Sequence, residues 1–242
     1  MLIEAHAKIN WTLEVLGKRE DGYHELKSIV MTVPLCDYIE IEPGEGVSAA
    51  DFPYGEKDLA YRAAKRLARL FPEGGVPGAR FKVEKRIPAG AGLGGGSADA
   101  AAVLKGLNEF WGLNLSVARL CEIGAEIGSD VPALIVGGAV MMEGRGERVR
   151  PLTAAESATL PRCEDIVIYT PNLACSTAAV YGEFREGDRH RGRNDLQSAA
   201  VRLYPGISAA LERLRSQGLS DVAMSGSGSS VYGVKNNEKG NS

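Results

Sequence analysis

The stretch GAGLGGGSADAAAVL, residues 90–104, places five glycines within seven positions, directly before a segment rich in helix-forming alanine. Glycine costs about 0.5–1 kcal/mol relative to alanine within regular structure, so such a cluster needs a structural reason. Glycine accepts positive φ and has no side chain, so this loop can turn several N–H groups toward one point. At the start of a helix these donors add to the helix dipole. The stretch therefore predicts a phosphate-binding loop rather than a flexible linker.

Composition narrows the class of protein. The 242 residues include 28 basic and 31 acidic ones, 44% are hydrophobic, and no basic stripe stands out, which argues against nucleic-acid binding. The four cysteines lack the spacing of a zinc site, so we expect no protein-bound metal. Charged Glu4 and Lys8 interrupt the apolar N-terminus, and no apolar run approaches the roughly 20 residues of a membrane span. We expect a cytoplasmic protein with reduced thiols and no membrane partner.

Apolar periodicity predicts the elements. Expected strands cover residues 2–17, 25–35, 37–43 and 79–88, with a buried strand at 164–171 and two short strands within 221–234. Expected helices cover 57–71, 97–112, 116–127, 176–184 and 194–218, with Ser97 and Ser116 as caps and a break near Pro205. The elements do not alternate as βαβ units, so the class is α+β. A composition shift at 149–162 predicts two domains, 1–150 and 151–242.

The glycine loop is neither a Walker A loop, which ends in Gly-Lys-Ser/Thr, nor a Rossmann fingerprint. Its pattern from Pro88 to Ser97 resembles the phosphate loop of the GHMP kinases, named for galactokinase, homoserine kinase, mevalonate kinase and phosphomevalonate kinase. AHAKIN (5–10), REDGYHEL (19–26), GSDVP (128–132) and MSGSGSS (224–230) resemble one branch, the 4-diphosphocytidyl-2-C-methyl-D-erythritol kinases. The motifs occur in the family order, and the resemblance covers almost the whole chain.

The resemblance implies a two-lobed GHMP kinase fold with the active site in the cleft between the lobes. It also implies transfer of the γ-phosphoryl group of ATP, with Mg²⁺, to the 2-hydroxyl of a small-molecule substrate, 4-diphosphocytidyl-2-C-methyl-D-erythritol. The products would be the 2-phosphate and ADP, a step in non-mevalonate isoprenoid synthesis. The expected oligomeric state is a monomer or homodimer.

The resemblance assigns catalysis to Asp130 and Lys8. Asp130 would act as the base, and Lys8 would keep it ionised and lower the pKa of the substrate hydroxyl. From the residues alone, Asp130 could equally cap a helix and Lys8 could face solvent. Asn10 lies two residues beyond Lys8 on the same strand face, so it can hydrogen-bond the same substrate.

The resemblance assigns the cytosine of the substrate to Tyr23 and His24, the tyrosine stacking on the ring and the histidine bonding its polar edge. Tyr181 matches a second aromatic residue that covers the base in some members. Without the resemblance, His24 would be read as a surface residue.

The residues expected to bind ATP lie in or just before the glycine loop: Lys85, Pro88, Gly90, Gly92, Leu93, Gly94, Gly95, Gly96 and Ser97. Lys85 could instead be a solvated strand lysine. A second loop, containing Gly226, Ser227 and Gly228, would close over the phosphates on the substrate side. Magnesium should bridge ATP oxygens with few protein ligands, and the Ser97 hydroxyl should face either the phosphates or Mg²⁺.

Two features depart from the family pattern. Asp58 stands where the family usually has an asparagine that helps hold adenine, and it can accept but not donate a hydrogen bond there. Only 12 residues follow Ser230, so we expect a truncated C-terminal lobe with an exposed sheet face or edge. Two alternatives to the proposed activity are a homoserine or sugar kinase, against which Tyr23 and His24 argue, and a catalytically impaired nucleotide-binding relative.

Overall fold

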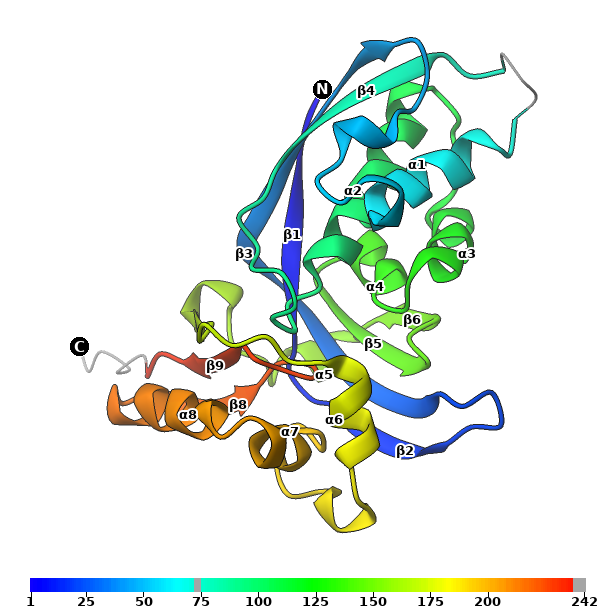
Figure 1. Cartoon of the computed structure of the whole chain (residues 1–242). Coiled ribbons are helices and arrows are strands. Elements are labelled where there is room, and N and C mark those ends of the chain that lie inside the picture. Colours follow the sequence, from blue (N-terminus) through cyan, green and yellow to red (C-terminus); the bar gives the residue numbers. More distant parts are fainter. Residues whose placement is uncertain (72–74, 237–242) are drawn as a thin grey trace.

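The computed structural model describes residues 1–71 and 75–236, which form two lobes, each built on an antiparallel sheet (Figure 1). The larger sheet has the order β1-β3-β5-β6, with β2 and β4 also paired to β3. Its strands are β1 (Leu2–Asn10), β2 (Glu14–Lys18), β3 (His24–Gly44), β4 (Gly78–Glu84), β5 (Ala139–Gly144) and β6 (Arg148–Pro151). The smaller sheet has the order β7-β9-β8, from β7 (Ile166–Tyr169), β8 (Ser220–Met224) and β9 (Val231–Val234). The α+β class is confirmed.

Strand β3 is the spine of the larger sheet, and it corrects the sequence prediction of two strands at 25–35 and 37–43. Its 21 residues run through Pro34, which is exposed. The ladder between β1 and β3 shifts register between His6 and Lys8, and this shift accommodates a residue that cannot donate a hydrogen bond. Conversely, the single strand predicted at 2–17 is two strands, because the chain leaves the sheet between Asn10 and Glu14.

Helices α1 (Leu59–Ala68), α2 (Gly95–Phe110), α3 (Val117–Ile127) and α4 (Val131–Val136) cover one face of the larger sheet (Figure 1). The central helix α2 buries Leu104 and Leu107 against Ile39 and Ile41 of β3 in one apolar cluster. Ser116 caps α3 as predicted. The prediction for Ser97 is wrong: α2 begins two residues earlier, and Gly94, in a left-handed conformation, occupies the cap position.

In the smaller lobe, helices α6 (Thr177–Glu183), α7 (Gln197–Leu203) and α8 (Gly206–Ser216) pack near the three-stranded sheet, and the predicted break near Pro205 is confirmed. A short helix α5 (Ala154–Ser157) lies in the connection between the lobes. Strand β7 was expected to be buried, but all four of its residues are only partly buried because it is an edge strand. The predicted C-terminal truncation falls on residues 237–242, which lie outside the described residues. No helix within the described ranges is long and apolar enough to cross a membrane.

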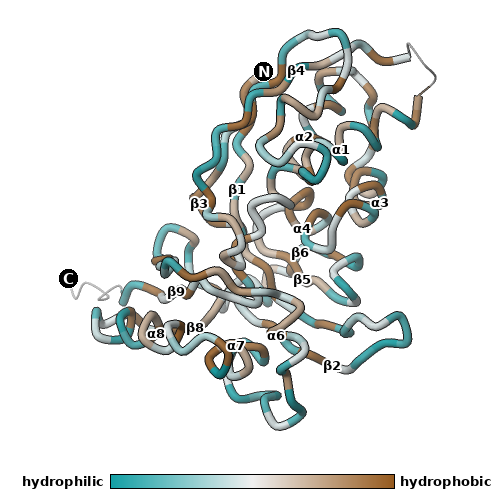
Figure 2. Tube along the Cα trace, viewed as in Figure 1, coloured by the Kyte–Doolittle hydropathy of each residue, from teal (hydrophilic) through white to brown (hydrophobic). Residues whose placement is uncertain are grey.

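The lobes share their hydrophobic clusters. Leu13 and Val15, at the start of β2, pack with Leu196, while Tyr232 of β9 packs with Trp11 and the core of the larger sheet. Figure 2 shows hydrophobic segments in the strands and helices of both lobes and hydrophilic residues at the turn between β2 and β3. Because both clusters contain residues from each lobe, they do not mark where one domain ends, and the domain boundary near residue 150 stays a prediction.

Asn194 links the segment before β2 to the second glycine loop. It forms a parallel bridge with Leu13, and its side-chain amide donates to the carbonyls of Met224 and Gly226, both at 2.8 Å. Its own oxygen accepts from the Leu196 amide at 2.9 Å. Only 4% of Asn194 is exposed, so water cannot replace these bonds.

Replacing Asn194 with aspartate should destabilise the fold. The substitution preserves shape but removes the donor, leaving two buried carbonyls facing a carboxylate. We expect the free energy of unfolding to fall by about 2–4 kcal/mol, measured by urea denaturation. The same change at exposed Asn114 should cost far less, and an equal loss at both positions would contradict this account.

Candidate active site

One cavity of about 1220 Å³ brings together residues from both lobes. Of the residues predicted from sequence, it is lined by Lys8, Asn10, Tyr23, His24, Lys85, Pro88, Gly90, Gly92, Gly94, Gly95, Gly96, Ser97, Asp130, Tyr181, Gly226, Ser227 and Gly228. Asp58 and Leu93 are the two predicted residues that are not in its lining. Another cavity, of about 610 Å³ over β4, is lined by none of the predicted residues.

The two glycine loops pack directly against each other. A Cβ atom on Gly92, where φ is +76°, would lie 2.3 Å from the Ser225 carbonyl oxygen, so only glycine fits. Ser225 Oγ donates to the Gly92 carbonyl at 3.0 Å, and the Ser230 amide donates to the Ala91 carbonyl at 3.0 Å. The loops thus form one wall of the cavity.

The first glycine loop presents backbone donors to the cavity. Residues Gly95, Gly96 and Ser97 form the first turn of α2, where amides have no helical acceptor. No side chain at the Gly94 cap satisfies them in the described structure. Amides of this kind, at the positive end of a 16-residue helix, suit an anionic phosphate. Leu93 instead supports the loop from within, because its side chain is buried and its carbonyl accepts from the Lys8 amide at 3.0 Å.

Lys8 and Asp130 meet at the centre of the cavity. The Lys8 ammonium lies 3.3 Å from Asp130 Oδ2 and donates to Asn10 Oδ1 at 2.6 Å, and only 3% of Lys8 is exposed. The Asn10 amide in turn donates to Ser28 Oγ at 2.8 Å. Lys8 is therefore not a solvent-facing lysine. Asp130 occupies the cap position of α4, but within the described residues its side chain makes no capping bond.

Aromatic side chains gather at one end of the cavity. The rings of His24 and Tyr181 stack with centroids 5.0 Å apart, and Phe184 meets His24 edge-on at 6.3 Å. Tyr23 is 55% exposed. Burial, aided by the charges of Lys18 and Arg189, lowers the pKa of His24 below its usual value, so its ring is neutral at physiological pH and keeps one acceptor nitrogen. Burial, with the charge of Asp130, raises the pKa of Tyr181 and keeps its hydroxyl protonated.

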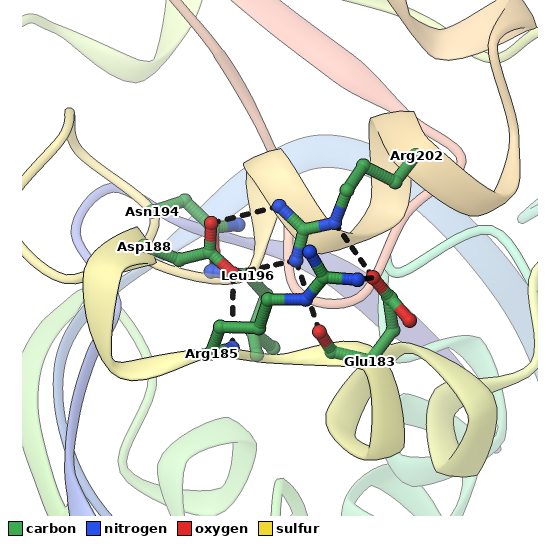
Figure 3. Close-up of polar contacts among 6 residues, drawn as sticks. All are labelled: Glu183, Arg185, Asp188, Asn194, Leu196 and Arg202. Carbon is green, nitrogen blue, oxygen red and sulfur yellow. Dashed lines mark hydrogen bonds and ion pairs between the residues drawn. The ribbon is translucent and has the colours of Figure 1, made fainter.

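An ion-pair network holds the helix that carries Tyr181 (Figure 3). Arg202 of α7 donates to the Glu183 side chain at 2.7 Å, to the Glu183 carbonyl at 2.9 Å, and to both oxygens of Asp188 at 2.7 and 2.8 Å. Asp188 also accepts from the Arg185 amide at 2.9 Å. These bonds fix the end of α6 and, with it, the positions of Tyr181 and Phe184. Sequence patterns did not reveal Phe184 or this network, because the partners meet only when α6 packs on α7.

Lys85 lines the cavity beside Gly95 and is paired, which corrects the alternative of a solvated lysine. Its ammonium bonds Asp37 and lies 2.5 Å from Asp99 Oδ2. Burial alone would lower the pKa of Lys85, but the hydrogen bonds to Asp37 and Asp99 outweigh it and raise the pKa. Asp37 also accepts from the backbone amides of Arg86 and Ile87. One ammonium cannot neutralise two buried carboxylates, and burial raises the pKa of Asp99, the less well bonded of the two, to about 7.

Asp58 lies outside the cavity. Its carboxylate caps α1 by accepting from the Ala60 amide at 2.9 Å, and only 4% of the residue is exposed. The neighbouring Leu59 lines the cavity instead. The structure therefore gives Asp58 a capping role, for which an aspartate directly before an apolar helix is a local signal, although the helix was predicted to begin at residue 57.

One group of potential metal ligands occurs among residues 1–71 and 75–236. Glu4, His6 and Cys36 offer ligand atoms within 4.8 Å of one another, outside the lining of the cavity. Spacing in the sequence did not reveal this group, because β1 and β3 place His6 opposite Cys36, 30 positions away.

The raised pKa of Asp99 predicts a pH dependence of stability. The folded chain keeps the Asp99 proton up to about pH 7, whereas an ordinary aspartate loses it near pH 3.8. The folded state thus binds more protons in this window, so the contribution of Asp99 to the free energy of unfolding falls as pH rises from about 4 to 7. Asp99→Asn should abolish this fall, measured by urea denaturation across that range. The exposed Glu109→Gln variant is the control, and parallel pH profiles for wild type and Asp99→Asn would contradict the assignment.

Comparisons with known proteins identify the family. The family model "GHMP kinases N terminal domain" matches residues 58–138, and "GHMP kinases C terminal" matches residues 177–241. The chain is 40% identical to a 4-diphosphocytidyl-2-C-methyl-D-erythritol kinase of Caldicellulosiruptor bescii, over 98% of this chain and 90% of the relative. It is 38% identical to the enzyme of the same name from Moorella thermoacetica, over 97% and 90%.

Solved structures give the same result. A crystal structure of 4-(cytidine 5'-diphospho)-2C-methyl-D-erythritol kinase superimposes with a TM-score of 0.81 and 34% identity, covering 98% of this chain and 90% of that one. The mevalonate kinase of Methanococcus jannaschii matches with a TM-score of 0.66 at 14% identity, over 99% and 92% of the two chains, a likeness of fold alone. The chain therefore belongs to the GHMP kinase family and, within it, to the 4-diphosphocytidyl-2-C-methyl-D-erythritol kinases.

Proposed function

We propose that the chain transfers the γ-phosphoryl group of ATP to the 2-hydroxyl of 4-diphosphocytidyl-2-C-methyl-D-erythritol, giving the 2-phosphate and ADP in non-mevalonate isoprenoid synthesis. One observation carries the proposal: the Lys8–Asp130 pair, at 3.3 Å, lies in the same cavity as a phosphate-type loop and a cluster of aromatic rings. The names of the relatives support the choice of substrate. They do not favour a catalytically impaired relative.

The ATP phosphates would bind to the amides of Gly95, Gly96 and Ser97, with Lys85 beside them. The second loop, at Gly226–Gly228, would close over the phosphates on the substrate side. The close packing at Gly92 supports this assignment, because it leaves backbone rather than side chains facing the phosphates. Mg²⁺ bound with ATP would supply positive charge to the phosphate oxygens, and we propose that the Ser97 hydroxyl faces it.

Asp130 would accept the proton of the 2-hydroxyl as that oxygen bonds the γ-phosphorus and the bond from phosphorus to the β-phosphate oxygen breaks. The Lys8 ammonium, 3.3 Å from Asp130, would stabilise negative charge on the attacking oxygen. Asn10 accepts from Lys8 and is itself held by Ser28, so the ammonium is fixed in direction. This preorganisation supports a role in positioning as well as charge.

The cytosine would bind at the aromatic end, stacked on Tyr23 or Tyr181, with its polar edge at His24. A neutral His24 can both donate to and accept from that edge. A homoserine or sugar substrate would leave this aromatic cluster without a partner. The proposed substrates are water-soluble metabolites, so we place the reaction in the cytoplasm, without nucleic-acid or membrane partners and with the chain acting as a monomer or homodimer.

Asp130→Asn tests the catalytic assignment. Incubation of the purified chain with Mg-ATP and 4-diphosphocytidyl-2-C-methyl-D-erythritol, following ADP release, should show turnover that falls about 10²–10⁴-fold in the variant, with KM little changed. Glu109→Gln, which removes an exposed carboxylate of α2, should behave as wild type. Undiminished turnover in Asp130→Asn would refute the role of Asp130. A wild-type chain that melts cooperatively but neither binds nor converts the substrate would refute the function.

Asp58→Ala tests whether the carboxylate binds adenine or only caps α1. Loss of the cap should lower the free energy of unfolding by about 1 kcal/mol and leave KM for ATP unchanged. Asp58→Asn keeps a capping oxygen and should restore stability. A KM for ATP that rises in Asp58→Ala but not in Asp58→Asn would instead assign the side chain to adenine.

A further inference from the structure

Four cationic side chains line the cavity in the described part of the chain, and they divide into two kinds. Lys8 is paired with Asp130, and Lys85 is paired with Asp37 and Asp99. Lys18 and Arg145 also line the cavity, but neither side chain makes a hydrogen bond or ion pair within residues 1–71 and 75–236. The cavity thus holds two positive charges that the described protein does not neutralise.

Both unpaired cations lie at the aromatic end of the cavity. Lys18 ends β2 and is the register partner of His24, whose pKa its charge helps to lower. Arg145 follows β5, which pairs with β3 so that Gly144 lies opposite Leu26. Its guanidinium carbon lies 5.0 Å from the centroid of the Tyr23 ring. Lys18, at the end of β2, and Arg145, directly after β5, therefore both lie at the aromatic end of the cavity.

The nearby carboxylates make their hydrogen bonds and ion pairs with other groups, although the charge of Arg145 also acts on Asp21 at longer range. Asp21 lies 3.2 Å from Arg19 and accepts from the Tyr23 amide at 3.1 Å. Glu25 accepts from Arg19 and from Arg148, at 2.5 and 2.7 Å. Glu147 accepts from the backbone amide of Arg145, not from its guanidinium. Lys18 and Arg145 consequently remain available to an anion that enters the cavity.

We infer that Lys18 and Arg145 form the subsite for the diphosphate group of a nucleoside diphosphate substrate, an inference that rests on the proposed function. A diphosphate esterified at both ends carries two negative charges, which the two cations match. A substrate whose base lies at His24 and whose hydroxyl reaches Asp130 must carry its diphosphate between these points. Arg145 stands on that path, because the next residue, Gly146, packs so closely on Ser129 beside Asp130 that a Cβ atom there would lie 2.4 Å from the Ser129 carbonyl oxygen. Guanidinium groups bind phosphate oxygens in a bidentate manner, and the ammonium supplies a second charge.

The contact between Arg145 and Tyr23 also determines which face of the Tyr23 ring is open to the base. One face of the Tyr23 ring lies under the guanidinium, which leaves the other face for the base. Arg145 therefore holds the ring while its outer donors remain free for phosphate. Tyr23 is 55% exposed, so its other ring face is accessible to a ligand.

Calorimetric titration of the whole chain with cytidine and with cytidine 5'-diphosphate tests the subsite. Wild type should bind the diphosphate at least about tenfold more tightly than cytidine, and this preference should weaken as salt is added. Lys18→Met should reduce diphosphate affinity about tenfold and leave cytidine affinity unchanged. Lys27→Met, which removes an exposed lysine of the same hairpin outside the cavity lining, should preserve both affinities.

Variants at Arg145 separate charge from ring packing. Arg145→Met should weaken both ligands, since it removes the charge and the contact with Tyr23. Arg145→Lys should recover most of the preference for the diphosphate over cytidine. In turnover assays, both charge-removing variants should act chiefly on KM for the cytidine substrate and not on KM for ATP.

The outcomes distinguish the subsite from the function. If the chain converts the substrate but Lys18→Met and Arg145→Met retain the wild-type ratio of diphosphate to cytidine affinity, the subsite is wrong and the proposed function stands. If wild type binds neither ligand and converts no substrate, the proposed function fails and the subsite fails with it.

Discussion

The contact between the two glycine loops is the constraint on which the rest of the site depends. At Gly92 the backbone passes so close to the Ser225 carbonyl that a Cβ atom would lie 2.3 Å from it. That approach brings the end of β8 in the smaller lobe against the loop that precedes α2 in the larger one. A side chain at this point would separate the loops, and the wall of the cavity would open. The glycine cluster is thus a packing requirement between lobes as well as a means of exposing amides.

Strand β1 ties the reacting side chains to that contact. The Lys8 amide bonds the Leu93 carbonyl at 3.0 Å, and the Asn10 amide bonds Ser225 Oγ at 3.2 Å. The backbone of β1 therefore contacts both loops, while the Lys8 side chain of the same strand points toward Asp130. These backbone hydrogen bonds fix the position of β1 relative to both loops, and so limit where the Lys8 ammonium can lie relative to a bound phosphate. A lysine on an exposed strand would have no such restraint.

Local signals in the sequence were enough to predict the glycine loop, the Ser116 cap, the break near Pro205 and the α+β class, and motifs carried by resemblance identified most of the candidate site. Features that depend on partners distant in sequence were missed or wrong. Asp58 was assigned to adenine from its place in the family motif; an aspartate before an apolar helix also favours a cap, but its burial depends on partners distant in sequence. The burial of β7 could not be judged from its apolar residues, because edge and central strands can share that pattern. Phe184 acquires its place beside the aromatic rings only when α6 packs against α7, which single-sequence periodicity does not describe.

Charge balance links the buried chemistry to the choice of ligand. Lys8 and Asp130 neutralise each other, and Lys85 with Asp37 and Asp99 approaches neutrality because burial pushes a proton onto Asp99. A low-dielectric site tolerates these compensated groups but would penalise further unpaired charge. Lys18 and Arg145 stand nearer the solvent, where an unpaired cation costs little in the free chain. The cavity thus keeps its unpaired positive charge at its aromatic end, where it can attract an anionic substrate without destabilising the core.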